Sequence, residues 1–180
     1  MGYEPGPECR ICKGRCCREH GCSLSPADLS HYLSLAGFSP KDFSKETLVS
    51  LLTHEKYGLF AIEYFWHNER QVYYLRMKHK CYTFVGVDAM GECIALTDEG
   101  CMLSMEDRPR GGRDLKSSPD FKCHQEYTSE EMSLDWLPYS DTLQEIYTEY
   151  EAIYNADGTF DKCDRDYFEY LKKQKLRETR

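Results

Sequence analysis

The stretch CRICKGRCC, residues 9–17, places four cysteines within nine residues, and we expect it to decide the fold. The spacing Cys9-x-x-Cys12 supplies two thiols from one turn, and Cys16 follows Cys12 by about one helical turn, so three thiols can face one point. Neighbouring side chains diverge, so Cys16 and Cys17 cannot easily bind the same ion. The sequence therefore predicts a small cysteine-rich core built around a metal.

Composition limits the class of protein. The 180 residues, 41% of them hydrophobic, fit one folded domain with a helical appendage. The chain has ten cysteines, no signal-peptide pattern and no 18-residue apolar run, so we expect a cytoplasmic protein that does not span a membrane. Cysteines in a reducing compartment serve metal ligation or redox chemistry. The alternative, that the cysteines form a disulfide framework, stays open if the protein comes from an organism such as a hyperthermophile. The net charge of -8 argues against nucleic acid, while a protein partner stays open.

The three thiols that can converge within residues 9–17 need at least one further ligand from elsewhere in the chain, because a thiolate site takes about four ligands around zinc or an iron–sulfur cluster. The spacing matches neither the ferredoxin run nor the CxxxCxxC of radical-SAM enzymes, and no Cys2His2 finger is present. Zinc and an iron–sulfur cluster therefore both remain open. The predicted metal ligands are Cys9, Cys12, Cys16, Cys17, Cys93, Cys101 and Cys123.

Other residues near these cysteines have competing interpretations. Arg108 and Arg113 are candidates for cofactor binding, because a guanidinium can donate hydrogen bonds to cluster sulfurs or to a substrate carboxylate. The alternative is that they only pin their loop onto the acidic helical part. Cys163 is expected to be a lone cysteine. Three histidines lie beside cysteines and can be ligands or ordinary histidines: His20, His79 and His124.

Two helices are predicted before the first strands. Ser25 can cap a helix over 26–36 that Gly37 ends, and a second helix begins at Ser44 and ends at Gly58. Aromatic and branched residues then predict a β-hairpin with strands Leu59 to His67 and Gln71 to Met77. Its Trp and Tyr side chains are interpreted as one buried sheet face rather than a stacking platform.

The second half of the chain changes from short strands to helices. Short β segments are expected at Tyr82 to Val87 and at Glu92 to Leu96, followed by irregular backbone over 107–120. Apolar spacing from Ser129 onward predicts a helix that ends at 155–158, and Asp164 begins a final one. The predicted fold class is α+β. A cysteine-cluster metal-binding domain, 1–125, precedes a helical C-terminal extension, 126–180, packed on it.

Three sequence phrases together resemble one known family. Cys9-Arg-Ile-Cys12-Lys-Gly-Arg-Cys16-Cys17 is followed by Leu24-Ser25-Pro26-Ala27-Asp28, and later come Cys93-Ile-Ala-Leu96, Cys101 and Arg108-Pro109-Arg-Gly-Gly112-Arg113. In these phrases the chain resembles the YkgJ-type cysteine-cluster proteins, which are described as a zinc- or iron-chelating domain. The resemblance covers roughly residues 8–125. Gly112 departs from the pattern, which has a cysteine there. Its replacement is expected among Cys22, Cys81, His20 and Cys123.

The resemblance implies metal binding more strongly than it implies a reaction. We therefore expect a protein that holds zinc or an iron–sulfur cluster through cysteine thiolates. The alternative is an iron–sulfur-dependent enzyme, either a redox protein or one similar to the lysine N-methylases of that family. A redox sensor that uses Cys16 and Cys17 is a third possibility. No catalytic residue is assigned, since the nucleotide-binding, zinc-protease and serine-hydrolase motifs do not occur.

Overall fold

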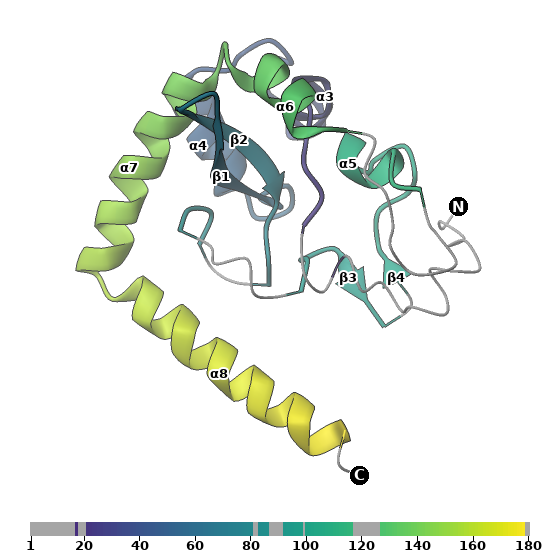
Figure 1. Ribbon diagram of the computed structural model, residues 1–180, viewed down its shortest axis with the longest axis vertical. Coiled ribbons are helices and arrows are strands. Elements are labelled where there is room, and N and C mark those ends of the chain that lie inside the picture. Colours follow the sequence, from purple (N-terminus) through teal and green to yellow (C-terminus); the bar gives the residue numbers. More distant parts are fainter. Residues whose placement is uncertain are drawn as a thin grey trace.

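The computed structural model describes residues 17, 21–80, 83–86, 92–98, 100–116 and 127–178. Within these ranges the protein is α+β, as predicted, with one long antiparallel hairpin and C-terminal helices (Figure 1). The elements are α3 (Pro26–Leu35), α4 (Lys45–Leu52), β1 (Phe60–His67), β2 (Arg70–Met77), β3 (Leu96–Thr97), β4 (Gly100–Cys101), α5 (Arg110–Arg113), α6 (Ser129–Trp136), α7 (Ser140–Ala156) and α8 (Thr159–Glu178).

The β1–β2 hairpin confirms the predicted strands. Its register runs from Phe60 opposite Met77 to His67 opposite Arg70. Asn68 and Glu69 form the two-residue turn with φ of 47° and 62°, and positive φ at both positions matches the right-handed twist of the strands. The segment before α3 pairs with the other edge of β2, because the Met77 amide donates to the Cys22 carbonyl at 2.8 Å.

Helix α3 begins as the sequence predicts. Ser25 and Asp28 form a capping box, in which each side chain binds the other residue's backbone N–H, and Pro26 occupies the first turn. Gly37 follows the helix with φ of 86°, a left-handed conformation that glycine adopts without steric cost. These local signals fix the direction in which the chain leaves the hairpin edge.

The core lies between the hairpin and the helices on its inner face. Leucines of α3 and α4 pack there against Phe60 and Ile62 of β1, together with α7 residues Leu143 and Ile146. Trp136 of α6 is fully buried and donates its indole N–H to the Leu24 carbonyl at 2.8 Å. Residues on both sides of the predicted boundary at 125 thus share this core, and the boundary itself lies outside the described residues.

Helix α8 leaves the rest of the molecule (Figure 1). Its first turn packs through Phe160, whose ring stacks edge-on against Tyr154 and lies against Gly86. Gly86 has a φ of 63°, which favours glycine, and a Cβ there would come within 2.6 Å of the tip of that ring. Among the described residues, no helix is both long enough and apolar enough to cross a bilayer.

Three predicted helix boundaries are wrong. The second helix ends at Leu52 rather than Gly58, because His54 accepts the Lys56 and Tyr57 amides on its Nδ1 and closes a turn instead. The helical region after Ser129 divides at Pro138, which has no N–H to continue α6. The last helix begins at Thr159 rather than Asp164.

Four other predictions differ from the structure. Within 83–86 the structure has no strand and bends at Phe84–Gly86, although the Phe84 carbonyl accepts the Ile62 amide at 2.7 Å. Within 92–96 only Cys93, in an isolated bridge, and Leu96 are paired. The segment over 107–120 contains the single turn α5 where irregular backbone was expected. Trp66, near the hairpin turn, is 67% exposed, so the buried-face prediction holds only toward the other end of the hairpin.

Candidate functional site

Four of the predicted ligands lie outside the described residues: Cys9, Cys12, Cys16 and Cys123. The same holds for Cys81, His20 and His124. None of the cysteines that the structure describes is in a disulfide: Cys17, Cys22, Cys93, Cys101 and Cys163. Within the described ranges, no group of three or more cysteines, histidines or carboxylates converges closely enough to hold an ion. A complete metal site would therefore have to include residues outside the described ranges.

The structure brings Cys17 and Cys93 together although they are distant in sequence. The Cys93 amide donates to the Cys17 carbonyl at 2.7 Å. Cys93 also pairs with His79 in an isolated antiparallel bridge, which continues the line of β2. These contacts place the end of the first cysteine cluster beside the segment that leads into β3 and β4.

Cys93 is buried and Cys101 lies on the neighbouring strand. Cys93 is 3% exposed, and desolvation by burial raises the pKa of its thiol to about 11, with a smaller contribution from the neighbouring Cys101. Cys101 is half-buried in β4, opposite Leu96. A bound cation would reverse this effect on Cys93, because it stabilises the thiolate that burial disfavours.

Cys22 lies against Gly112, the position where the resembled family has a cysteine. A Cβ built on Gly112 would come within 2.9 Å of the Cys22 Sγ. The Cys22 sulfur therefore occupies the space into which a side chain at 112 would extend. Of the replacements expected for the missing cysteine, Cys22 is the one that the structure describes in contact with this position.

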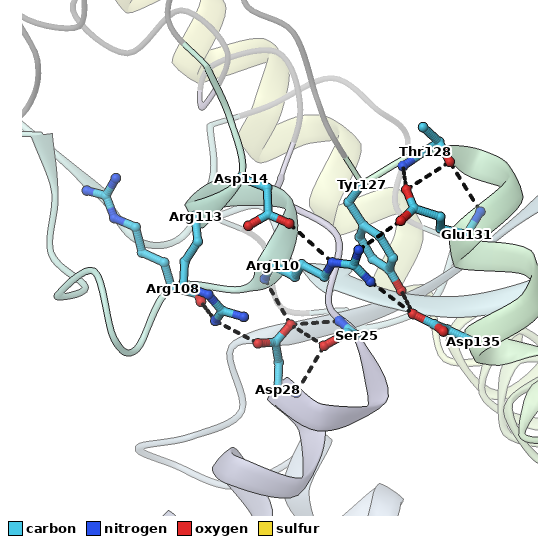
Figure 2. A network of polar contacts seen from close by, with 10 residues as sticks. All are labelled: Ser25, Asp28, Arg108, Arg110, Arg113, Asp114, Tyr127, Thr128, Glu131 and Asp135. Atoms are coloured by element: carbon cyan, nitrogen blue, oxygen red, sulfur yellow. Dashed lines mark hydrogen bonds and ion pairs between the residues drawn. The ribbon is translucent and has the colours of Figure 1, made fainter.

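A network of arginines and carboxylates holds α5 against α3 (Figure 2). Asp28 is 5% exposed and accepts four hydrogen bonds. Two come from the Ser25 amide and hydroxyl at 2.7 and 2.9 Å, one from the Arg110 amide at 2.8 Å, and one from Arg113 Nη1 at 2.7 Å. Arg113 also donates to the Arg108 carbonyl. The Arg113 guanidinium is thus directed at a carboxylate of this chain.

Arg110 extends the network to α6. Its guanidinium lies 2.9 Å from Glu131 and 3.3 Å from Asp135, and it stacks on the Tyr127 ring at 4.2 Å. The Tyr127 hydroxyl donates to Asp135 at 2.9 Å, and burial together with that carboxylate raises the pKa of Tyr127 above its ordinary value. Pinning of the 107–116 loop onto the acidic helical part is therefore carried by Arg110, a residue that the sequence analysis did not select.

The network sets how close the loop comes to the cysteine segment. The Gly111 amide donates to the Ser23 carbonyl at 3.0 Å. A Cβ at Gly111 would lie 2.9 Å from the Ser23 backbone nitrogen, so only glycine permits this approach. Arg108 lies in the same loop, and its Nε donates to the Leu103 carbonyl at 3.4 Å.

A buried charge near Cys93 was also missed by the sequence analysis. Arg76 is 3% exposed on β2, on the hairpin face that carries Glu63 and Tyr74. Its Nε lies 2.5 Å from Glu63 Oε2, and its Nη1 lies 3.4 Å from His79 Nε2. The signal for it was present in the sequence, because an arginine interrupts the apolar strand QVYYLRM.

Comparison of the chain with protein-family models, with curated proteins and with solved structures found no match. What the protein does must therefore be argued from its own residues.

Proposed function

We propose that the protein binds zinc or an iron–sulfur cluster through cysteine thiolates drawn from two distant parts of the chain. The observation that carries the proposal is the hydrogen bond from the Cys93 amide to the Cys17 carbonyl. It joins the end of the stretch with four thiols to the segment that carries Cys93 and Cys101. A metal held by both parts would link them and supply folding free energy.

The donor set fits such a centre. The proposed ligands are thiols, which zinc and iron–sulfur clusters prefer, and none of the described ones is in a disulfide. Cys93 and Cys101 are buried and half-buried respectively, so a centre there would be partly shielded from water. The ligands proposed from the first cluster are Cys9, Cys12 and Cys16 or Cys17, completed from Cys93, Cys101 and Cys123.

The test is metal analysis of protein purified without oxygen. We expect zinc or iron in a fixed ratio to protein, with a visible absorption band in the case of an iron–sulfur cluster and none for zinc. Cys93→Ala should lower the bound metal. The matched control is Cys163→Ala on α8, far along the chain from the proposed ligands, which should leave the bound metal unchanged.

Two results would reject the proposal. One is wild-type protein that is folded and contains neither zinc nor iron, including after reconstitution with either metal. The other is a Cys93→Ala variant that retains the full metal content, since Cys93 is the residue that the carrying observation brings to the first cluster.

A further inference from the structure

Arg76 is a buried cation whose donors are not all used. Its Nε and Nη2 atoms are buried, and among the described residues neither finds a hydrogen-bond acceptor. Glu63 forms a close ion pair with Nε, but the N–H is not directed at the carboxylate oxygen as a hydrogen bond requires. Leaving charged donors unsatisfied in the interior is costly, so this arrangement points to an additional acceptor.

The described partners of Arg76 do not supply that acceptor. The Glu63 carboxylate is about one-third exposed and also accepts the Tyr74 hydroxyl at 3.3 Å. His79 faces Nη1, and because a guanidinium can only donate, this contact requires an unprotonated His79 Nε2. One carboxylate and one neutral imidazole therefore surround a guanidinium that has five N–H donors.

The contacts of Arg76 lead to both cysteine segments. Arg76 itself pairs with Ser23, next to Cys22, in an isolated antiparallel bridge. Its neighbour His79 pairs in the same way with Cys93. The end of β2 thus lies between the chain segments that carry Cys22 and Cys93, and the Arg76 guanidinium lies at this end.

A thiolate-bound metal is an acceptor of suitable charge. Four thiolates on a Zn²⁺ ion leave a net charge of about −2, and their sulfurs accept hydrogen bonds. A cationic donor beside such a centre offsets this charge and tunes its metal affinity or reduction potential. The chain has a net charge of -8, so a fixed cation beside a buried anionic centre would lower the electrostatic cost of adding further negative charge.

We infer that Arg76 is the counter-charge of the thiolate centre and donates hydrogen bonds from its unused N–H groups to cysteine sulfurs. The inference rests on the proposed function. Arg76 is a positioning residue in this role and is not a metal ligand.

The experiment compares metal affinity with the stability of the metal-free protein. Zinc affinity is measured by competition with a chromophoric chelator, or the reduction potential is measured if the centre holds iron. Arg76→Gln should weaken zinc binding roughly 10–100-fold, the range typical of residues that support metal ligands. Arg76→Lys, which keeps the charge, should restore part of that loss. Arg70→Gln on the same strand is the control, because Arg70 is exposed and pairs with Asp141 at the surface.

The metal-free protein gives the readout that separates this role from a structural one. In the metal-free protein the buried, unsatisfied Nη2 of Arg76 offsets part of what its ion pair with Glu63 contributes, so metal-free Arg76→Gln should lose less free energy of unfolding than the variant loses in zinc-binding free energy. Glu63→Gln removes the competing carboxylate from a partly exposed position, so it should leave zinc affinity unchanged or tighten it. This second variant tests the inference even if Arg76→Gln does not fold.

The outcomes are distinct. Wild-type protein without metal would reject the proposed function and this inference together. Wild-type protein with metal, combined with an Arg76→Gln variant of unchanged affinity, would reject the inference alone. If Arg76→Gln loses as much free energy of unfolding in the metal-free protein as it loses in zinc-binding free energy, Arg76 has a purely structural role and the inference is wrong. Weaker zinc binding by Glu63→Gln would also overturn the inference.

Discussion

Asp28→Asn tests whether the buried carboxylate holds the 107–116 loop against the cysteine segment. In the wild type, Asp28 Oδ2 accepts the Ser25 amide, the Ser25 hydroxyl and the Arg110 amide, while Oδ1 accepts Arg113 Nη1. An asparagine keeps one acceptor oxygen. That oxygen can still accept the Ser25 and Arg110 donors, but it no longer carries a negative charge. The NH2 group of the asparagine then faces the Arg113 guanidinium, which is also a donor.

The magnitude follows from these bonds. A hydrogen bond to a charged group contributes about 1.5–3 kcal/mol, and removing one partner of a fully buried ion pair costs about 3–5 kcal/mol. The Arg113 side chain is about one-third exposed, which reduces the second figure. We therefore expect Asp28→Asn to lower the free energy of unfolding by about 2–4 kcal/mol. For a chain of this size, the loss corresponds to a fall in Tm of roughly 5–15 °C.

The assay is urea unfolding followed by circular dichroism, together with hydrogen exchange of the peptide that covers α5. Exchange at Gly111 should accelerate, because its amide donates to Ser23 across the contact that Asp28 supports. Asp141→Asn is the matched control. Asp141 is 86% exposed and pairs with Arg70 at the surface, so its loss should cost no more than about 0.5 kcal/mol. An Asp28→Asn protein as stable as this control, with unchanged exchange at Gly111, would refute the reasoning.

Three further predictions concern the same region. Gly111→Ala should destabilise the protein by about 1–3 kcal/mol in urea unfolding, because its Cβ would meet the Ser23 backbone; wild-type stability would contradict this close approach. Gly112→Ala and Cys22→Ala should be coupled, since the first places a methyl group against the Cys22 sulfur and the second removes that sulfur. The double variant should be more stable than the sum of the single effects predicts, by at least about 0.5 kcal/mol, and additive effects would show that the two positions do not touch. In the metal-free protein, burial raises the pKa of Cys93 from 9.0 to about 11, so its neutral thiol adds stability below pH 9 that is lost as the pH rises to 11. The stability difference between wild type and Cys93→Ala should shift by roughly 2–3 kcal/mol across this window, and a difference independent of pH would be inconsistent with a buried thiol.

The sequence predicts best those elements whose signals are local. The helix cap at Ser25, the glycine at 37 and the β1–β2 hairpin are all present where expected. Each depends on residues within a few positions of one another. The errors at helix ends have equally specific causes, namely the His54 turn and Pro138.

The candidate site was less predictable because its contacts join distant residues. Asp28 suits a helix N-terminus in the sequence, but its partners Arg110 and Arg113 come from a segment far along the chain. Arg76 lies in an apolar strand, where alternation alone indicates which face it occupies and nothing about the charges beside it. The approach of Cys93 to Cys17 likewise depends on pairing across the end of β2, which no local pattern encodes.

The most direct test of the central claim is X-ray absorption at the zinc or iron edge of the purified protein. The proposed thiolate centre predicts a shell of about four sulfur scatterers, at ~2.3 Å in the case of zinc, and fewer sulfurs in Cys93→Ala. A shell made only of nitrogen and oxygen, or no stoichiometric metal at either edge, would contradict it.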